Sequence, residues 1–130
     1  VSPTVVSSRE LAEAIASRLQ GVAPEGISIR ASGEQIRVIR GGSVVGGSSA
    51  PGILGSRDDR PDDRQVETAA RSAISAIQDV LAEELRTPWP APTGSMPGPC
   101  ARVEGTTLII WFGAEDDPYL ALPPIELPQR

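Results

Sequence analysis

Residues 63–86 read DRQVETAARSAISAIQDVLAEELR, and this stretch decides the fold. Its apolar residues recur every three or four positions and form a stripe made of Val66, Ala70, Ile74, Ile77, Leu81 and Leu85. Such a stripe predicts a long amphipathic helix with one face on a hydrophobic core. Proline disfavours helical geometry in the residue before it, so Pro88 is expected to stop the helix just after Thr87.

A shorter helix is predicted near the N-terminus. Ser7 and Glu10 have the spacing of a capping box, in which each side chain bonds the backbone N–H of the other residue. Leu11, Ile15 and Leu19 then repeat every four residues, which predicts a second amphipathic helix. Gly21 is suited to end it because glycine adopts left-handed geometry at no steric cost.

A first hairpin is expected between the two helices. The sequences ISIRA (27–31) and IRVIR (36–40) alternate between apolar and polar residues, as strands with one buried face do. Ser32 and Gly33 lie between them and provide a turn.

A second hairpin is expected after the long helix. CARVE (100–104) and TTLIIWF (106–112) flank a turn at Gly105. Residues 108–112 are apolar on both faces of the predicted strand. This predicts either a central strand covered on both sides or a strand with one face against a partner.

The order of predicted elements is α-β-β-α-β-β, which indicates the α+β class. We expect a two-layer sandwich in which two helices cover one face of an antiparallel sheet. The two hairpins align around Gly33 and Gly105. A duplicated αββ unit and chance similarity explain that alignment equally well.

The length of 130 residues fits a single domain over residues 1–130. Three segments are expected to lie outside the helices and hairpins: a flexible Gly/Ser loop at 41–62, a proline-rich loop at 87–99 and an extended tail at 113–130. Short edge strands are expected at Val44–Val45 and at Tyr119–Leu122, and Pro123 and Pro124 are expected to end the second of them.

The composition excludes several kinds of chemistry. The chain has no His, all twelve of its basic residues are Arg, and Cys100 is its one cysteine. An imidazole base, a lysine Schiff base, an internal disulfide and a thiolate zinc cluster are therefore absent. These absences disfavour an enzyme, and acid–base chemistry would rest on carboxylates, Tyr119 or Cys100.

The net charge and the length of the hydrophobic runs disfavour two classes of partner, nucleic acids and membranes. A net charge of −5 disfavours nucleic-acid binding, which needs clustered positive charge. The longest apolar run, 108–112, is too short to cross a membrane, and no leader is visible, so we expect a cytoplasmic protein. We expect no cofactor and no membrane partner.

The segment SRDDRPDDRQ at residues 56–65 is the most charged in the chain. One hypothesis makes it a divalent-metal site, because carboxylate oxygens suit Mg²⁺ and Ca²⁺. The ligands would be Asp58, Asp59, Asp62 and Asp63. A second acidic cluster at 115–117 could join them. The other hypothesis is a helix cap in a solvated loop, and it explains more, because the interleaved arginines offset the charge that a cation needs.

The Gly/Ser loop permits two interpretations. Its backbone N–H groups could cradle a phosphate, which would make the protein a small-molecule binder. However, the loop lacks the lysine motif and the glycine spacing of known phosphate loops, which favours a mobile loop. Cys100 is better explained as a small buried hydrophobe than as a reactive thiol.

The leading functional hypothesis is a non-enzymatic protein-interaction or self-associating domain. Its predicted interaction residues are Trp89, Met96, Trp111 and Tyr119. Core packing is the competing role for these side chains. The expected partner is another protein or a second copy, because a free edge strand can pair with itself in a homodimer. The alternatives are a metal-dependent enzyme on phosphorylated or sugar substrates, using the aspartates, and a small-molecule binder under the Gly/Ser loop.

Overall fold

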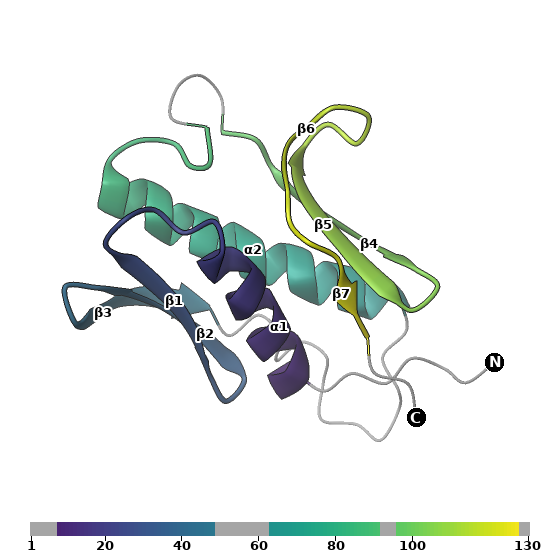
Figure 1. Cartoon of the computed structure of the whole chain (residues 1–130), viewed down its shortest axis with the longest axis horizontal. Helices are drawn as coiled ribbons and strands as arrows, with labels where there is room; N and C mark the ends of the chain where they lie inside the picture. Colours follow the sequence, from purple (N-terminus) through teal and green to yellow (C-terminus); the bar gives the residue numbers. More distant parts are fainter. Residues whose placement is uncertain (1–7, 49–62, 92–95, 128–130) are drawn as a thin grey trace.

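The computed structural model describes residues 8–48, 63–91 and 96–127 (Figure 1). The chain forms two helices and seven strands in these ranges. They are α1 (Ser8–Gln20), β1 (Ile27–Ser32), β2 (Gln35–Arg40), β3 (Ser43–Ser48), α2 (Asp63–Leu85), β4 (Pro99–Glu104), β5 (Thr107–Gly113), β6 (Pro118–Ala121) and β7 (Ile125–Glu126). Ser7, the predicted cap of the first helix, lies outside the described residues.

The α+β class is confirmed, and the strands are divided between two antiparallel sheets instead of forming one. The first sheet has the order β1-β2-β3, and the second has β4-β5-β6 with β7 also paired to β5. The reason lies in helix α2, which follows β3, precedes β4 and packs on both strands. Helix α2 therefore connects the two sheets by packing on both of them. In a single sheet, hydrogen bonds between strands would make that connection. The duplication of an αββ unit is not confirmed.

The apolar stripe of α2 forms the centre of the core, as its periodicity predicts. Val66, Ala70, Ile74, Ile77 and Leu81 are all 2% exposed or less. The helix ends at Leu85, close to the predicted stop before Pro88.

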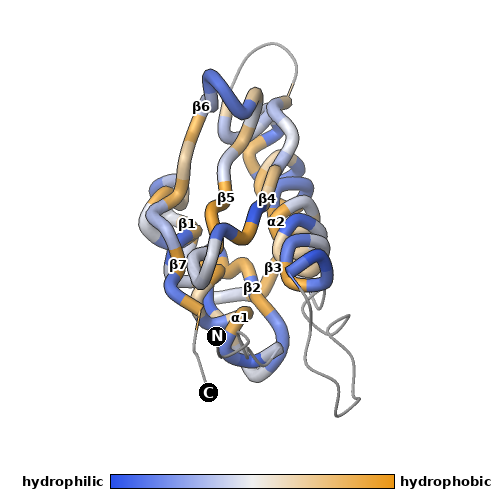
Figure 2. Tube along the Cα trace, turned by 90° about the vertical axis from the view of Figure 1, so that its right-hand side faces the viewer, coloured by the Kyte–Doolittle hydropathy of each residue, from blue (hydrophilic) through white to orange (hydrophobic). Residues whose placement is uncertain are grey.

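The two sheets form the other side of the core, and each sheet contributes one buried face to it. On the first sheet, Ile29, Ile36 and Val38 are buried against the helices. On β5, Leu108, Ile110 and Phe112 face the core, so the residues between them lie on the opposite face of the sheet. Figure 2 shows the resulting alternation of hydrophobic and hydrophilic residues along β4.

Helix α2 approaches β3 closely because β3 carries glycine where the two elements meet. A Cβ atom added at Gly46 would lie 2.7 Å from Cγ2 of Val80 and 3.3 Å from its Cβ. Valine has one strongly preferred rotamer in a helix, so this side chain cannot turn away. Gly46 therefore sets the distance between α2 and the first sheet.

A double-mutant cycle tests this contact. We expect Gly46→Ala to lower the free energy of unfolding by about 1–3 kcal/mol, as overpacking of a core contact does. In the Val80→Ala background the same change should cost much less, because the clashing methyl groups are gone. Chemical denaturation measures all four proteins, and equal costs in both backgrounds would contradict the contact.

A buried amide fixes the segment that follows α2. Gln78 is 2% exposed, and its Nε2 donates to the carbonyl oxygens of Trp89 at 3.0 Å and Pro97 at 2.6 Å. The two acceptors lie on either side of residues 92–95. One side chain of the helix thus holds both ends of the proline-rich segment against the core.

Removal of this amide should destabilise the protein. We expect Gln78→Met to lower the free energy of unfolding by about 1–3 kcal/mol, because it leaves two carbonyls without their donor. Glu83→Met is the matched control on the same helix, and its exposed side chain predicts a change within about 0.5 kcal/mol. Thermal denaturation of both variants measures the difference, and an equal effect would disprove the role of Gln78.

Candidate functional site: a cleft between helix α1 and strand β7

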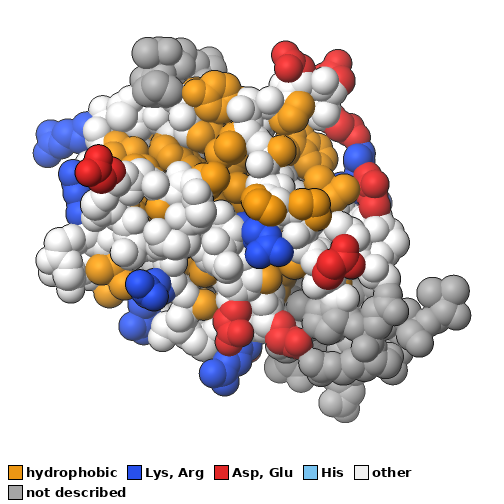
Figure 3. Space-filling view, viewed as in Figure 1, with side chains coloured by type: hydrophobic (Ala, Val, Ile, Leu, Met, Phe, Trp, Pro, Cys, Tyr) orange, Lys and Arg blue, Asp and Glu red, His pale blue; other side chains and the backbone are white. Residues whose placement is uncertain are grey.

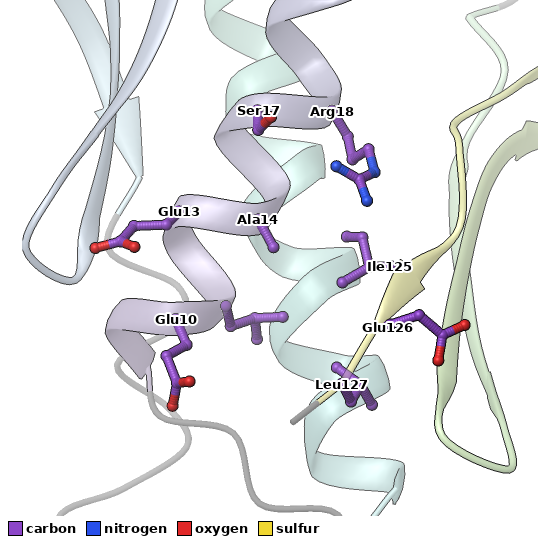
Figure 4. A pocket seen from close by; sticks show the side chains of 9 residues that line it. Glu10, Glu13, Ala14, Ser17, Arg18, Ile125, Glu126 and Leu127 are labelled. Atoms are coloured by element: carbon purple, nitrogen blue, oxygen red, sulfur yellow. The ribbon is translucent and has the colours of Figure 1, made fainter. Parts of the chain in front are cut away.

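A cavity with a volume of about 390 Å³ lies where α1 faces β7 (Figure 4). The helix supplies one wall, and residues at the C-terminal end of the described chain supply the other. The lining residues are Glu10, Leu11, Glu13, Ala14, Ser17, Arg18, Ile125, Glu126 and Leu127.

The wall formed by β7 depends on an interrupted edge strand. β6 and β7 run along the same edge of β5. On either side of the interruption, the backbone N–H of Leu122 donates to the carbonyl oxygen of Ile110 in β5, and that of Leu127 donates to the carbonyl oxygen of Thr106 just before β5. Pro123 and Pro124 separate the two short strands. Because prolines have no N–H, they cannot continue the ladder, and their carbonyls need another partner.

Arg18 is that partner. Its Nε donates to the carbonyl oxygen of Pro123 at 3.1 Å, and its Nη2 donates to that of Pro124 at 2.9 Å. The planar guanidinium offers several donors in a fixed fork, which suits two adjacent acceptors. Arg18 therefore ties α1 to the C-terminal edge strand and closes one end of the cleft.

The interior of the cleft is apolar, and its rim is acidic. Leu11, Ile125 and Leu127 are buried members of the core, and Ala14 lies between them at the centre of the helix wall (Figure 4). Three glutamates also line the cavity: Glu10, Glu13 and Glu126. Figure 4 shows the side chains of Glu13 and Glu126 pointing away from the apolar centre, to either side, so their carboxylates lie at its margin.

Two of these carboxylates have exposed partners. Oε1 of Glu13 pairs with Nε of Arg9 at 3.2 Å, and both side chains are largely exposed. Oε1 of Glu126 accepts from the Thr107 hydroxyl at 2.8 Å. Exposed interactions of this kind are weak, so an incoming cation can compete for these carboxylates. On the face seen in Figure 3, acidic side chains lie to the right of and below the region where α1 and β7 lie side by side, and a basic side chain lies at its upper part.

The cleft also runs along a strand edge. The register of β7 on β5 directs the peptide groups of Ile125 and Leu127 toward β5. The alternation of an antiparallel ladder then leaves the N–H and C=O of Glu126 on the other edge. Figure 4 shows α1 on that side of β7 and β5 on the opposite side. The cleft therefore combines an apolar floor, carboxylates and backbone hydrogen-bonding groups.

The four predicted interaction residues do not form one surface. Trp89 is buried in the core, where its ring meets Phe112 edge-on at a centroid distance of 5.4 Å. Trp111 lies on the opposite face of the second sheet, next to Ala121 of β6. Tyr119 belongs to the same strand as Ala121 and is 57% exposed. Their role in binding stays a prediction.

Trp111 and Met96 have distinct surroundings. The guanidinium carbon of Arg102 lies 5.5 Å from the centroid of the Trp111 ring, in cation–π geometry. The indole N–H of Trp111 is buried and has no hydrogen-bond partner in the described structure. Met96 is exposed just before Pro97, one of the acceptors of Gln78.

The predicted metal ligands are mostly outside the described residues. Asp58, Asp59 and Asp62 fall there, and Asp63 is the exposed first residue of α2. In the second acidic cluster, Glu115 pairs with Arg102. Within 8–48, 63–91 and 96–127, no group of three or more His, Cys, Asp or Glu side chains is placed to hold a metal.

The Gly/Ser loop and Cys100 can be described only in part. Residues 43–48 of the predicted loop form β3, which extends the short edge strand expected there, and residues 49–62 lie outside the described part. Cys100 is half-buried, and its Sγ lies 3.7 Å from the carbonyl oxygen of Gly113.

Comparison with known proteins identifies no relative. No protein-family model, no curated protein and no solved structure matches the chain. Neither helix that the structure describes is long and apolar enough to span a membrane.

Sequence reasoning missed the residues of the cleft. One signal was present, because the Pro123–Pro124 pair interrupts a run of strand-forming residues and leaves two carbonyls without ladder partners. The residue that binds them, Arg18, lies more than a hundred positions earlier in the chain. Only the folded chain brings these residues together.

The link made by Arg18 should control the mobility of the edge strand. We expect Arg18→Ala to speed hydrogen exchange at the Leu122 and Leu127 amides by roughly tenfold, which corresponds to about 1.4 kcal/mol of local opening. Arg18→Lys should give an intermediate effect, because an ammonium cannot reproduce the two-pronged donation. Exchange monitored by NMR measures both.

Arg9→Ala is the matched control for this experiment. It removes an arginine from the same helix, whose partner Glu13 is exposed and does not touch β7. Exchange at Leu122 and Leu127 should therefore stay unchanged. Equal acceleration in the Arg9 and Arg18 variants would contradict the proposed link.

Proposed function

We propose that this chain is a non-enzymatic protein-interaction domain and that the cleft between α1 and β7 receives a segment of another protein. The observation that carries the proposal is the combination of an apolar floor, an acidic rim and a strand edge that no described strand pairs with, all in one cavity. Extended peptides bind other proteins through these three features.

The strand edge favours a peptide over a compact small molecule. A segment lying beside β7 could exchange hydrogen bonds with the N–H and C=O of Glu126 and so add a strand to the second sheet. Side chains alternate along such a segment. Every second side chain would then point toward Leu11, Ala14 and Ile125.

The acidic side chains of the rim favour a partner segment that carries positive charge. Three of the four charged side chains that line the cleft are glutamates. The fourth, Arg18, already donates to two carbonyls. We therefore propose a partner segment with an apolar anchor flanked by Lys or Arg, because complementary charge gives both specificity and a faster encounter.

Selection from a displayed library of random short peptides tests the proposal. We expect enriched peptides to combine an apolar residue with neighbouring Lys or Arg. Their affinity for the protein should fall by about tenfold or more in the Ala14→Trp variant, whose indole fills the centre of the cleft, a loss of about 1.4 kcal/mol. Fluorescence anisotropy with the synthesised peptides measures the affinities.

Ser72→Trp is the matched control, because it places the same side chain at an exposed position of α2. It should bind the selected peptides as the wild type does. Two outcomes would refute the proposal: no enrichment of any sequence, or peptides that bind the Ala14→Trp protein as tightly as the wild type.

A further inference from the structure

We infer that β3 is a second interaction surface, through which two copies of this chain pair edge to edge. This inference does not depend on the cleft, which lies against the other sheet. It rests on three properties of β3: an unpaired edge, two exposed valines and a hollow next to them.

The edge of β3 lacks the usual protection of an edge strand. In the first sheet β3 pairs with β2 on one side, and no described strand pairs with its other side. Proteins normally guard such edges with charged residues or proline. The strand reads SVVGGS and contains neither.

The opposite edge of the same sheet is guarded. The backbone N–H of Ile29 in β1 donates to Oε1 of Gln20 at 2.6 Å, so a helix side chain already occupies part of that edge. β1 also carries the exposed Arg30. The contrast between the two edges marks β3 as the one suited to pairing.

Val44 projects from this edge as an apolar knob. It is 56% exposed and Val45 is 36% exposed, which makes them two of the four large hydrophobic residues exposed within the described ranges. Exposed valines on an uncharged strand edge are costly in water unless a partner covers them.

A hollow of about 270 Å³ lies beside this knob. Its lining residues are Gln35, Ile36, Arg37, Val44, Gly46, Gly47 and Ser48. Gly47 cannot be replaced without strain, since a Cβ atom there would lie 2.4 Å from the carbonyl oxygen of Ile36. The hollow is therefore a fixed part of the surface.

A bulge puts Val44 and Gly47, which both line the hollow, on the same face of the sheet. Val44 pairs with Ile39, and Gly47 pairs with Arg37 two positions away, so Val45 is the extra residue of β3. Val44 and Gly47 consequently face the same side. In an unbulged strand, residues three apart would face opposite sides.

Antiparallel pairing of two such strands is self-complementary. Residues that face each other across an antiparallel pair point to the same face. Val44 of each copy can therefore lie over Gly47 of the other, which makes two equal contacts about a twofold axis. The same register sets Ser43 opposite Ser48 of the second copy. The bulge limits regular pairing to a few residues, so we expect dimerisation that depends on concentration.

Sedimentation velocity over a wide concentration range tests this inference. We expect the wild type to change from monomer to dimer as its concentration rises, and Val44→Lys to stay monomeric, because it sets two ammonium groups into the shared edge. Ser32→Lys is the matched control, since it adds the same charge at an exposed end of β1, and it should dimerise as the wild type does. A wild type that stays monomeric, or a dimer that survives Val44→Lys, would overturn the inference.

A disulfide trap tests the register without relying on Val44→Lys. In a Cys100→Ser background, Ser43→Cys and Ser48→Cys lie at opposite ends of β3 and cannot bond within one chain. Mild oxidation should link two copies covalently. No covalent dimer at concentrations where the protein dimerises would contradict the proposed pairing.

Discussion

The whole structure depends on the apolar stripe of helix α2. Among the strands that the structure describes, none of the first sheet pairs with one of the second, so the burial of this stripe against both sheets keeps them in one core. The buried side chains of the stripe, from Val66 to Leu81, each contribute roughly 1–3 kcal/mol of hydrophobic stabilisation. Gly46 lets the first sheet come close to α2, and Gln78 holds the segment beyond α2 in place.

The cleft follows from a local defect in the second sheet. A continuous edge strand would direct only every second carbonyl away from β5, whereas at the two prolines the ladder stops and two adjacent carbonyls face Arg18 of α1. Arg18 binds both carbonyls, and α1 is thereby set beside β7. The interrupted strand thus supplies one wall of the cleft, part of its acidic rim and the strand edge that lies along it. β3 shows the same principle, since its bulge sets Val44 and Gly47, which line one hollow, on the same face of the sheet.

The sequence predicted the elements well because they follow from local periodicity. The stripe of α2, the alternation in the first hairpin and the apolar run of β5 each match an observed element to within a few residues. The division into two sheets was not predictable in this way, because it depends on where α2 packs and not on any strand's own pattern. Trp89 lies in the core, the competing role that the sequence left open for it, because an aromatic residue between two prolines suits both a core and a binding surface.

The most direct test of the proposed peptide cleft is to map, by NMR, the shift changes that the tightest selected peptide causes in the protein. The proposed cleft predicts that the largest shift changes fall on Ala14, Ile125 and Leu127, and that exchange of the Glu126 amide slows as it gains a partner. Changes centred instead on Trp111 and Tyr119 would contradict it. That result would place the binding surface on the opposite face of the second sheet.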